Sequence, residues 1–268
     1  MVLRVTLPPL VALSLLCLPA TAKDYFLTIG GGYSPSGNQV SLEKNVLMFQ
    51  DLLAEAYPDG AAHQVLFADG RDPGRDLQFH DEARLPALNR SLARLFKQTK
   101  ELGFEYRNSN IPDVHDASTK ETIERWFSEQ GKQLGGGDRL LIYVTAHGGS
   151  AADKKNDPYN TKLYLWNQQH IQVKDFVKLL DTLDPEVQVV TVMVQCYAGG
   201  YANIAFEEGD ENSPAAAANR CGFFATVHDR VAAGCTPDID EANYHEYSTY
   251  FWQAIRGKSR LGDSIEQP

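Results

Sequence analysis

The chain has 268 residues, with 25 lysines and arginines against 35 acidic residues, for a formal net charge of −10 at pH 7. This acidic balance argues against nucleic acid or an anionic membrane surface as the main partner. The length suits one large domain or two small ones and allows a sizeable buried core.

The N-terminus has the pattern of a secretory signal peptide. Arg4 precedes the apolar run LPPLVALSLLCLP, and Ala20-Thr21-Ala22 matches the small-x-small cleavage pattern. That run is too short and too broken by proline for a membrane span. We therefore expect residues 1–22 to be a signal peptide and residues 23–268 to be one exported domain, periplasmic or secreted, without a membrane span once the signal is removed.

Removal of the signal would leave three cysteines, Cys196, Cys221 and Cys235. An exported compartment permits disulfides. Cys221 and Cys235 flank one predicted strand and loop, so we expect a disulfide between them and a free Cys196. The alternative is that all three thiols are reduced and buried.

Hydrophobic periodicity and turn residues predict the elements of the chain. In chain order they are a strand over 24–32, a helix over 40–57, a strand over 63–69, a surface loop over 70–86, a helix over 87–102, a helix capped by Asp116 or Ser118, a strand ending at Ala146, a strand over 162–167, a helix over 173–183, a strand over 187–195, a short helix near 199–208, an exposed loop over 207–220, a strand over 222–227 and a helix over 244–257.

Strands alternate with helices along this order, and three of the strands are apolar almost throughout. Such a pattern predicts an α/β fold with a mostly parallel sheet covered by helices on both faces. Ligands of these sheets bind at the carboxyl ends of the strands. Two predicted strands end in chemically interesting residues, one at His147-Gly148-Gly149 and the other at Cys196.

A thiol and an imidazole at one edge of a sheet can perform nucleophilic catalysis. The imidazole takes the proton of the thiol, and the thiolate attacks a carbonyl carbon. Backbone N–H groups in a glycine turn can then stabilise the oxyanion. We expect the N–H groups of Gly148 and Cys196 to be these donors.

These residues resemble the caspase–legumain clan of cysteine peptidases, and the legumain-type branch in particular. An apolar strand ends in His-Gly, a second ends in Gln-Cys and a small-residue turn, and the two catalytic positions are 49 residues apart, against about 50 in caspases. The resemblance implies a caspase-like three-layer α/β/α sandwich and an endopeptidase without metal or cofactor. Cys196 would be the nucleophile and His147 the general base and acid, with the oxyanion held at Gly148 and Cys196.

The sequence departs from the clan around the substrate pocket. Legumains carry an acidic residue two positions before the cysteine, where this chain has Val194, and Arg-His after the first strand, where it has Gly37-Asn38. By position, the residues expected to bind substrate are Ser36, Asn38, Gln39, Gln195, His228 and Asp229. Asp229 would favour a basic P1 residue; the alternative is that it pairs with Arg230 or with solvent.

Other chemistries find little support. The stretch IGGGYSPSGNQ lacks the Lys-Ser/Thr of a P-loop, and the chain has no CxxC, HExxH or GxSxG motif. The run EEGDEN does not have the spacing of an EF-hand and reads as a solvated acidic loop that is open to processing. The expected partner is therefore a peptide or protein substrate and not nucleic acid. The competing hypothesis is an inactive pseudopeptidase that binds peptide as a regulatory module.

Overall fold

The computed structural model describes residues 22–96, 102–236 and 246–257. Residues 1–21 of the expected signal peptide lie outside this part of the chain. At its centre is a six-stranded sheet in the order β11-β10-β6-β1-β2-β5, and every pairing in it is parallel. The strands are β1 (Asp24–Gly31), β2 (Ala62–Phe67), β5 (Val114–Asp116), β6 (Arg139–Ala146), β10 (Gln188–Met193) and β11 (Arg220–Phe224).

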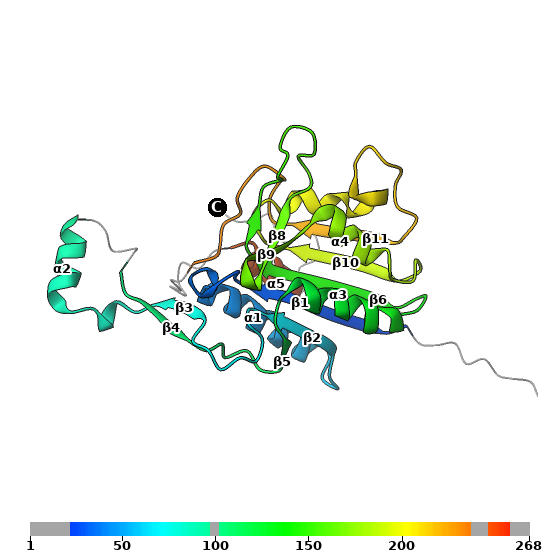
Figure 1. Ribbon diagram of the computed structural model, residues 1–268. Coiled ribbons are helices and arrows are strands. Elements are labelled where there is room, and N and C mark those ends of the chain that lie inside the picture. The colour runs from blue at the N-terminus through cyan, green and yellow to red at the C-terminus, as the bar shows by residue number, and fades with distance from the viewer. Residues whose placement is uncertain (1–21, 97–101, 237–245, 258–268) are drawn as a thin grey trace, which may run out of the picture.

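Helices cover both faces of the sheet (Figure 1). On one face lie α3 (Lys120–Glu129) and α4 (Val173–Leu180), whose apolar side chains share a core with β1, β6 and β10. On the other face lie α1 (Val40–Ala56) and α5 (Tyr247–Arg256). This is the three-layer α/β/α sandwich predicted from the alternation of strands and helices.

Local sequence explains where two of the helices lie. The buried apolar residues of α1 are spaced by three and four, as a helix with one face on a sheet requires: Leu42, Val46, Phe49 and Leu53. Helix α3 begins after Thr119, whose side chain accepts a hydrogen bond from the N–H of Thr122 at 3.2 Å. The expected caps at Asp116 and Ser118 are therefore wrong by one to three residues.

A second, small sheet lies beyond the carboxyl end of β6. Its three antiparallel strands are β7 (Gly148–Gly149), β8 (Lys162–Leu165) and β9 (Gln169–Gln172). The N–H of Tyr164 donates to the carbonyl of His147 at 3.0 Å. The backbone that follows β6 is thus held in place on both sides of the histidine.

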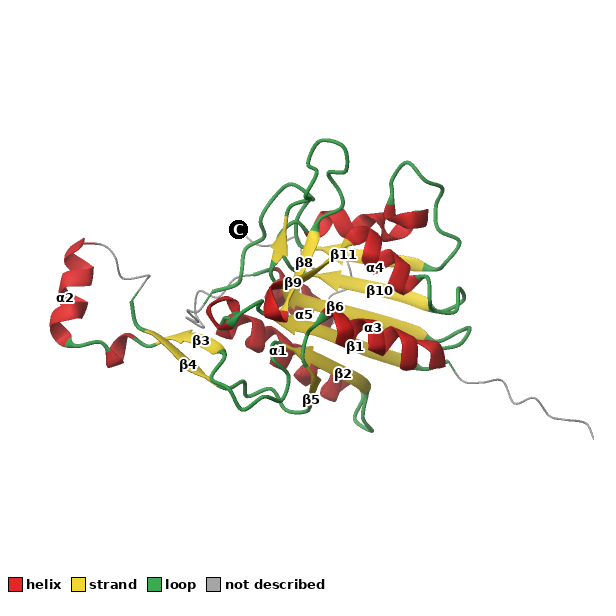
Figure 2. Cartoon of the chain, viewed as in Figure 1, coloured by secondary structure: helices red, strands yellow, loops and turns green. Residues whose placement is uncertain are grey.

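An arm projects from the body beyond the edge at which the parallel strands end (Figures 1 and 2). It consists of β3 (Leu77–His80), α2 (Ala87–Phe96) and β4 (Phe104–Arg107), and β3 pairs with β4 in antiparallel fashion. The prediction of a plain loop over 70–86 is wrong, because Leu77 and Gln78 are buried at the foot of the arm. The last residues of the helix predicted over 87–102 lie outside the described residues.

No helix in the described part of the chain is long and apolar enough to cross a membrane.

Candidate functional site

His147-Gly148 and Cys196 meet at the carboxyl edge of the sheet. A methyl group on Gly148 would lie 1.9 Å from the carbonyl oxygen of Cys196 and 2.8 Å from Cγ of Gln195, so only glycine fits there. This close approach places the residue after the histidine directly against the cysteine backbone. The prediction that the ends of β6 and β10 form one site is supported by this contact.

Hydrogen bonds to one nitrogen fix the ring of His147. Nε2 lies 2.8 Å from the carbonyl oxygen of Gly37 and 2.8 Å from Oε1 of Gln39. The Gln39 amide is oriented by its own Nε2, which donates to the carbonyl of Ser36 at 3.0 Å. Because both partners are acceptors, Nε2 carries the hydrogen, and Nδ1 is left unprotonated to accept one.

The surroundings of His147 favour its neutral form. Burial lowers the pKa of the imidazole below its usual value, and the hydrogen bond to the Gly37 carbonyl partly offsets this effect. Tyr33 packs edge-on against the ring, with centroids 5.3 Å apart. A neutral imidazole with a free Nδ1 is the form that can take a proton from a thiol.

Asn38 lies beneath this loop and does not face a substrate. Its side chain is fully buried; Nδ2 donates to Oδ2 of Asp76 at 2.9 Å, and Oδ1 accepts from the N–H of Gly32 at 3.0 Å. Its carbonyl accepts from the N–H of Gln78 at 2.7 Å. The prediction that Asn38 binds substrate is therefore wrong, since its polar atoms are used to fix the loop. Gln39, predicted for the same role, orients His147 instead.

A pair of carboxyl groups supports Asn38. Burial raises the pKa of Asp69 to about 7, and the neighbouring Asp76 adds to this rise. Burial also raises the pKa of Asp76. The pair lies where β2 and β3 approach the loop that holds His147. No motif in the sequence marked this support, because Asp69 and Asp76 each lie in polar surroundings along the chain.

The thiol of Cys196 contacts the segment that follows β11. Its Sγ accepts from the N–H of Ala232 at 3.3 Å, and the N–H of Tyr197 donates to the carbonyl of Arg230 at 2.8 Å. Within the described chain, no hydrogen bond joins Cys196 Sγ to His147, and no acceptor takes the Cys196 N–H. The N–H group is thus available for an oxyanion.

The backbone turns sharply after Cys196. Tyr197 has a φ of 59°, in the left-handed region that costs a non-glycine residue about 1–2 kcal/mol. Its carbonyl accepts from Oγ1 of Thr161 at 3.0 Å, which helps to hold the turn. Strained residues of this kind concentrate at functional sites.

Gln195 presents a buried amide beside the two central residues. The side chain is 0 % exposed, and neither Oε1 nor Nε2 has a hydrogen-bond partner in the described chain. A buried polar atom without a partner costs about 1–3 kcal/mol, so natural proteins rarely leave one without a use. The predicted role of Gln195 in substrate binding is compatible with this arrangement.

His228 and Asp229 lie on the segment that also covers Cys196. The ring of His228 packs against Tyr159, with centroids 4.1 Å apart. Asp229 is exposed and forms no ion pair within the described residues, so it does not pair with its neighbour Arg230. Its position next to the cysteine contacts leaves the predicted pocket role open.

The expected disulfide between Cys221 and Cys235 is absent, and both thiols are free. Cys221 pairs with Val190 in the sheet, level with Leu141, whereas Sγ of Cys235 contacts the carbonyl of Ala146 at 3.8 Å. Ala146 is five residues farther along β6, about 16 Å at the usual strand rise. Disulfides need Cα atoms within about 7 Å, so this pairing cannot form.

Cys235 instead lies close to the candidate nucleophile. Burial raises the pKa of its thiol to about 12, and the proximity of Cys196 adds to the rise. Cys235 therefore remains a protonated thiol at neutral pH, so of these two neighbouring cysteines it is not the candidate nucleophile.

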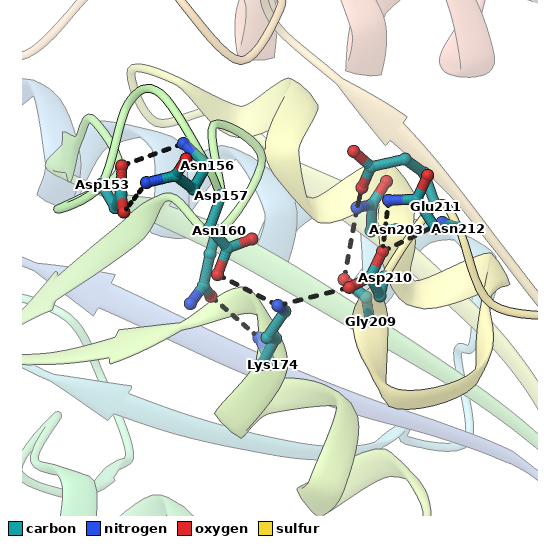
Figure 3. Close-up of polar contacts among 10 residues, drawn as sticks. All are labelled: Asp153, Asn156, Asp157, Asn160, Lys174, Asn203, Gly209, Asp210, Glu211 and Asn212. Carbon is teal, nitrogen blue, oxygen red and sulfur yellow. Dashed lines mark hydrogen bonds and ion pairs between the residues drawn. The ribbon is translucent and has the colours of Figure 1, made fainter.

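The acidic run near residue 210 is tied to its surroundings (Figure 3). Lys174 on α4 reaches Asp157 at 3.0 Å and Asp210 at 3.5 Å, and Asn203 donates to Glu211 at 2.7 Å. A lysine ammonium here neutralises the charge that a calcium ion would otherwise balance. Among the described residues, no group of three or more His, Cys, Asp or Glu side chains is placed to hold a metal ion.

Comparisons with known proteins give no family for this chain. No family model matches it, and no curated protein matches it. Among solved structures, protein GSU0716 from Geobacter sulfurreducens is similar over 65 % of this chain and 50 % of its own, with 16 % identity and a TM-score of 0.37. The matching part thus spans half the length of that structure.

Proposed function

We propose that the chain is an exported cysteine endopeptidase of the caspase–legumain type. The observation that carries the proposal is the packing of Gly148 against the Cys196 backbone, with His147 held through Nε2 beside it. This arrangement supplies a thiol, a neutral base with a free Nδ1 and a free backbone N–H at one point of the sheet edge.

The reaction would proceed through a thioester. Nδ1 of His147 takes the proton of the Cys196 thiol while the sulfur attacks the carbonyl carbon of the scissile amide. The oxyanion is stabilised by the N–H groups of Cys196 and Gly148. The imidazolium then gives its proton to the departing amine. In the second half, His147 takes a proton from water, which cleaves the thioester and releases the acid.

One movement must precede this chemistry. In the structure, Cys196 Sγ accepts a hydrogen bond from Ala232 and none from His147. Catalytic hydrogen bonds are often long or misaligned without substrate and tighten when it binds. A substrate strand that displaces the segment around Ala232 would free the sulfur to approach Nδ1.

The P1 side chain would lie between the Gln195 amide and the segment that carries Asp229. The buried amide offers an unused donor and an unused acceptor. The exposed carboxylate of Asp229 would favour lysine or arginine at P1.

The test is cleavage of a mixed peptide library by the chain from residue 23 onwards, with cut sites read by mass spectrometry. We expect cuts that vanish in Cys196→Ala and in His147→Ala, with basic residues at P1 that are lost in Asp229→Asn. Cuts that persist in Cys196→Ala would rule out the proposed nucleophile. Cys221→Ala, an exposed cysteine away from the site, is the matched control.

A pseudopeptidase is the second candidate. The observation that favours it is the engagement of Cys196 Sγ by Ala232 in place of His147. Such a protein would bind peptides from the same library without cutting them, and iodoacetamide would not modify Cys196 faster than Cys221. An active enzyme would show rapid alkylation of Cys196 at neutral pH.

A further inference from the structure

The helix at the tip of the arm has an exposed apolar face. Leu88, Leu92, Leu95 and Phe96 are 68 %, 43 %, 73 % and 66 % exposed. At 100° per residue these four side chains fall within an arc of about 100°, which forms one stripe along α2. Large apolar side chains grouped in this way mark a contact surface, whereas isolated ones do not.

The rest of α2 is positively charged. Arg90 and Arg94 are four residues apart and lie on the side opposite the apolar stripe. Residues 83–96 contain three arginines and no acidic residue, although the whole chain has a net charge of −10. Arg84, near the start of this stretch, forms ion pairs with Asp81 and Glu105 at the outer end of the β3–β4 pair.

The arm separates this charge from the acidic body. In Figures 1 and 2, α2 lies well outside the sandwich, joined to it by β3 and β4. Charges are screened beyond about 8 Å at physiological ionic strength, so a surface that contacts α2 interacts mainly with the helix. The net charge of −10 on the whole chain therefore does not prevent the arm from binding an anionic surface.

From these features we propose that α2 is an interfacial helix that holds the protein against a membrane surface with anionic lipid headgroups. A helix with leucine and phenylalanine on one face and arginine on the other, and with little overall hydrophobicity, lies in the plane of such a surface. A second copy of the chain fits the apolar stripe but would bring the same positive charge. Anionic headgroups supply the complementary charge.

The experiment is co-sedimentation of the chain from residue 23 onwards with vesicles of phosphatidylcholine, with and without phosphatidylglycerol. We expect binding to the anionic vesicles that weakens as salt is raised. The double variant Leu92→Glu/Leu95→Glu should bind at least about tenfold more weakly. Arg90→Gln should lose about fivefold.

The matched control is Ile255→Glu, which changes an equally exposed apolar residue on the body, 56 % exposed at the end of α5. It should bind vesicles as the unchanged chain does, and circular dichroism should show the same fold for all variants. Failure to bind anionic vesicles, or full binding by the leucine variant, would overturn the proposal. A dimer in solution would also overturn the proposal if the leucine variant were monomeric and the unchanged chain did not bind vesicles. That result would mean that the apolar face of α2 contacts a second copy of the chain.

Discussion

The two halves of the candidate site are held in different ways. On the His147 side, the buried Asn38 fixes the loop between β1 and α1 through its side chain. The carbonyl oxygen of Gly37 and Oε1 of Gln39, both on this loop, then hold the ring of His147. On the Cys196 side, the segment after β11 touches the thiol through the backbone of one residue, Ala232, whose N–H lies 3.3 Å and whose carbonyl oxygen 3.9 Å from Sγ. Under the proposed mechanism, His147 would thus be oriented before substrate arrives, and Cys196 would be released when it binds.

The point where the two halves touch should be the most sensitive to mutation. Gly148→Ala places a methyl group 1.9 Å from the Cys196 carbonyl, so the backbone of one half must move. We expect a loss of about 3 kcal/mol or more in the free energy of unfolding and no detectable peptide cleavage. Denaturant titration and the library assay measure both. Gly135→Ala, where the added methyl meets nothing within 4 Å, should change neither.

The loop that holds His147 can be weakened at its buried residue, Asn38. Asn38→Ala leaves the Gly32 N–H and the Asp76 carboxylate without their buried partner, at a cost of about 1–3 kcal/mol in stability. Asn156 makes the same bond to Asp153 at 2.7 Å on the surface, so Asn156→Ala should cost less than about 0.5 kcal/mol (Figure 3). Equal losses in the two variants, by denaturant titration, would contradict a special role for the loop.

The charge state of the base gives a smaller and more specific effect. Because burial lowers the pKa of His147, activity should persist below pH 6.5 and fall only as the pH passes through that lowered value. Gln39→Glu places a carboxylate at Nε2, which favours the imidazolium and should move this acid limb up by about one pH unit.

The measurement is kcat/KM against pH for both proteins. At pH 6 the Gln39→Glu variant should be slower than the unchanged chain, and near pH 8 the two rates should converge. Gln39→Leu removes the acceptor without adding charge, so its rate should fall without an upward shift of the acid limb. An unshifted profile in Gln39→Glu would show that Gln39 does not contact the ring in solution.

The smallest effect is expected on the reactivity of Cys196. Ala232→Pro removes the N–H that donates to Cys196 Sγ, and a thiolate that loses a donor forms less readily. Iodoacetamide alkylation of Cys196 at neutral pH should slow by about threefold. Ala233→Ser, at the exposed next residue of the same segment, keeps every backbone N–H and should leave the rate unchanged. Faster alkylation in Ala232→Pro would mean that the segment shields the sulfur more than it activates it.

Much of the sheet could be predicted from the sequence. The apolar runs that became β1, β6 and β10 are continuous or nearly so, as central strands buried on both faces must be, whereas β2 and the edge strand β11 were recognised from shorter apolar runs. Strand β5 could not be recognised because it has three residues, two of them polar. Strands β3 and β4 have four residues each and are only partly buried, so their pattern does not differ from that of a loop.

The candidate site, like the sheet, could be predicted from the sequence only in part. The meeting of His147 and Cys196 follows from parallel topology, which brings the ends of buried strands to one edge. The directions of Asn38 and Gln39 depend on the short 3-10 turn of Pro35–Gly37 between β1 and α1. No periodicity describes such a turn, so the substrate-binding role predicted for both residues did not anticipate that Asn38 fixes the loop and Gln39 orients His147. The predicted disulfide between Cys221 and Cys235 is wrong because a short separation in sequence does not show how far apart two residues lie along the strands.

The pairing of β1 with β6 has a consequence for the order of folding. Asp24 lies beside Arg139, 115 residues later, and His147 contacts a loop 110 residues earlier. Proteins dominated by such distant contacts fold slowly. Strand β1 can pair with β2 early, but its other neighbour, β6, begins only at Arg139, so one side of β1 stays unpaired until then. The candidate site therefore cannot assemble before β6 has been made, and the export proposed above would have this interval in which the chain is still unfolded.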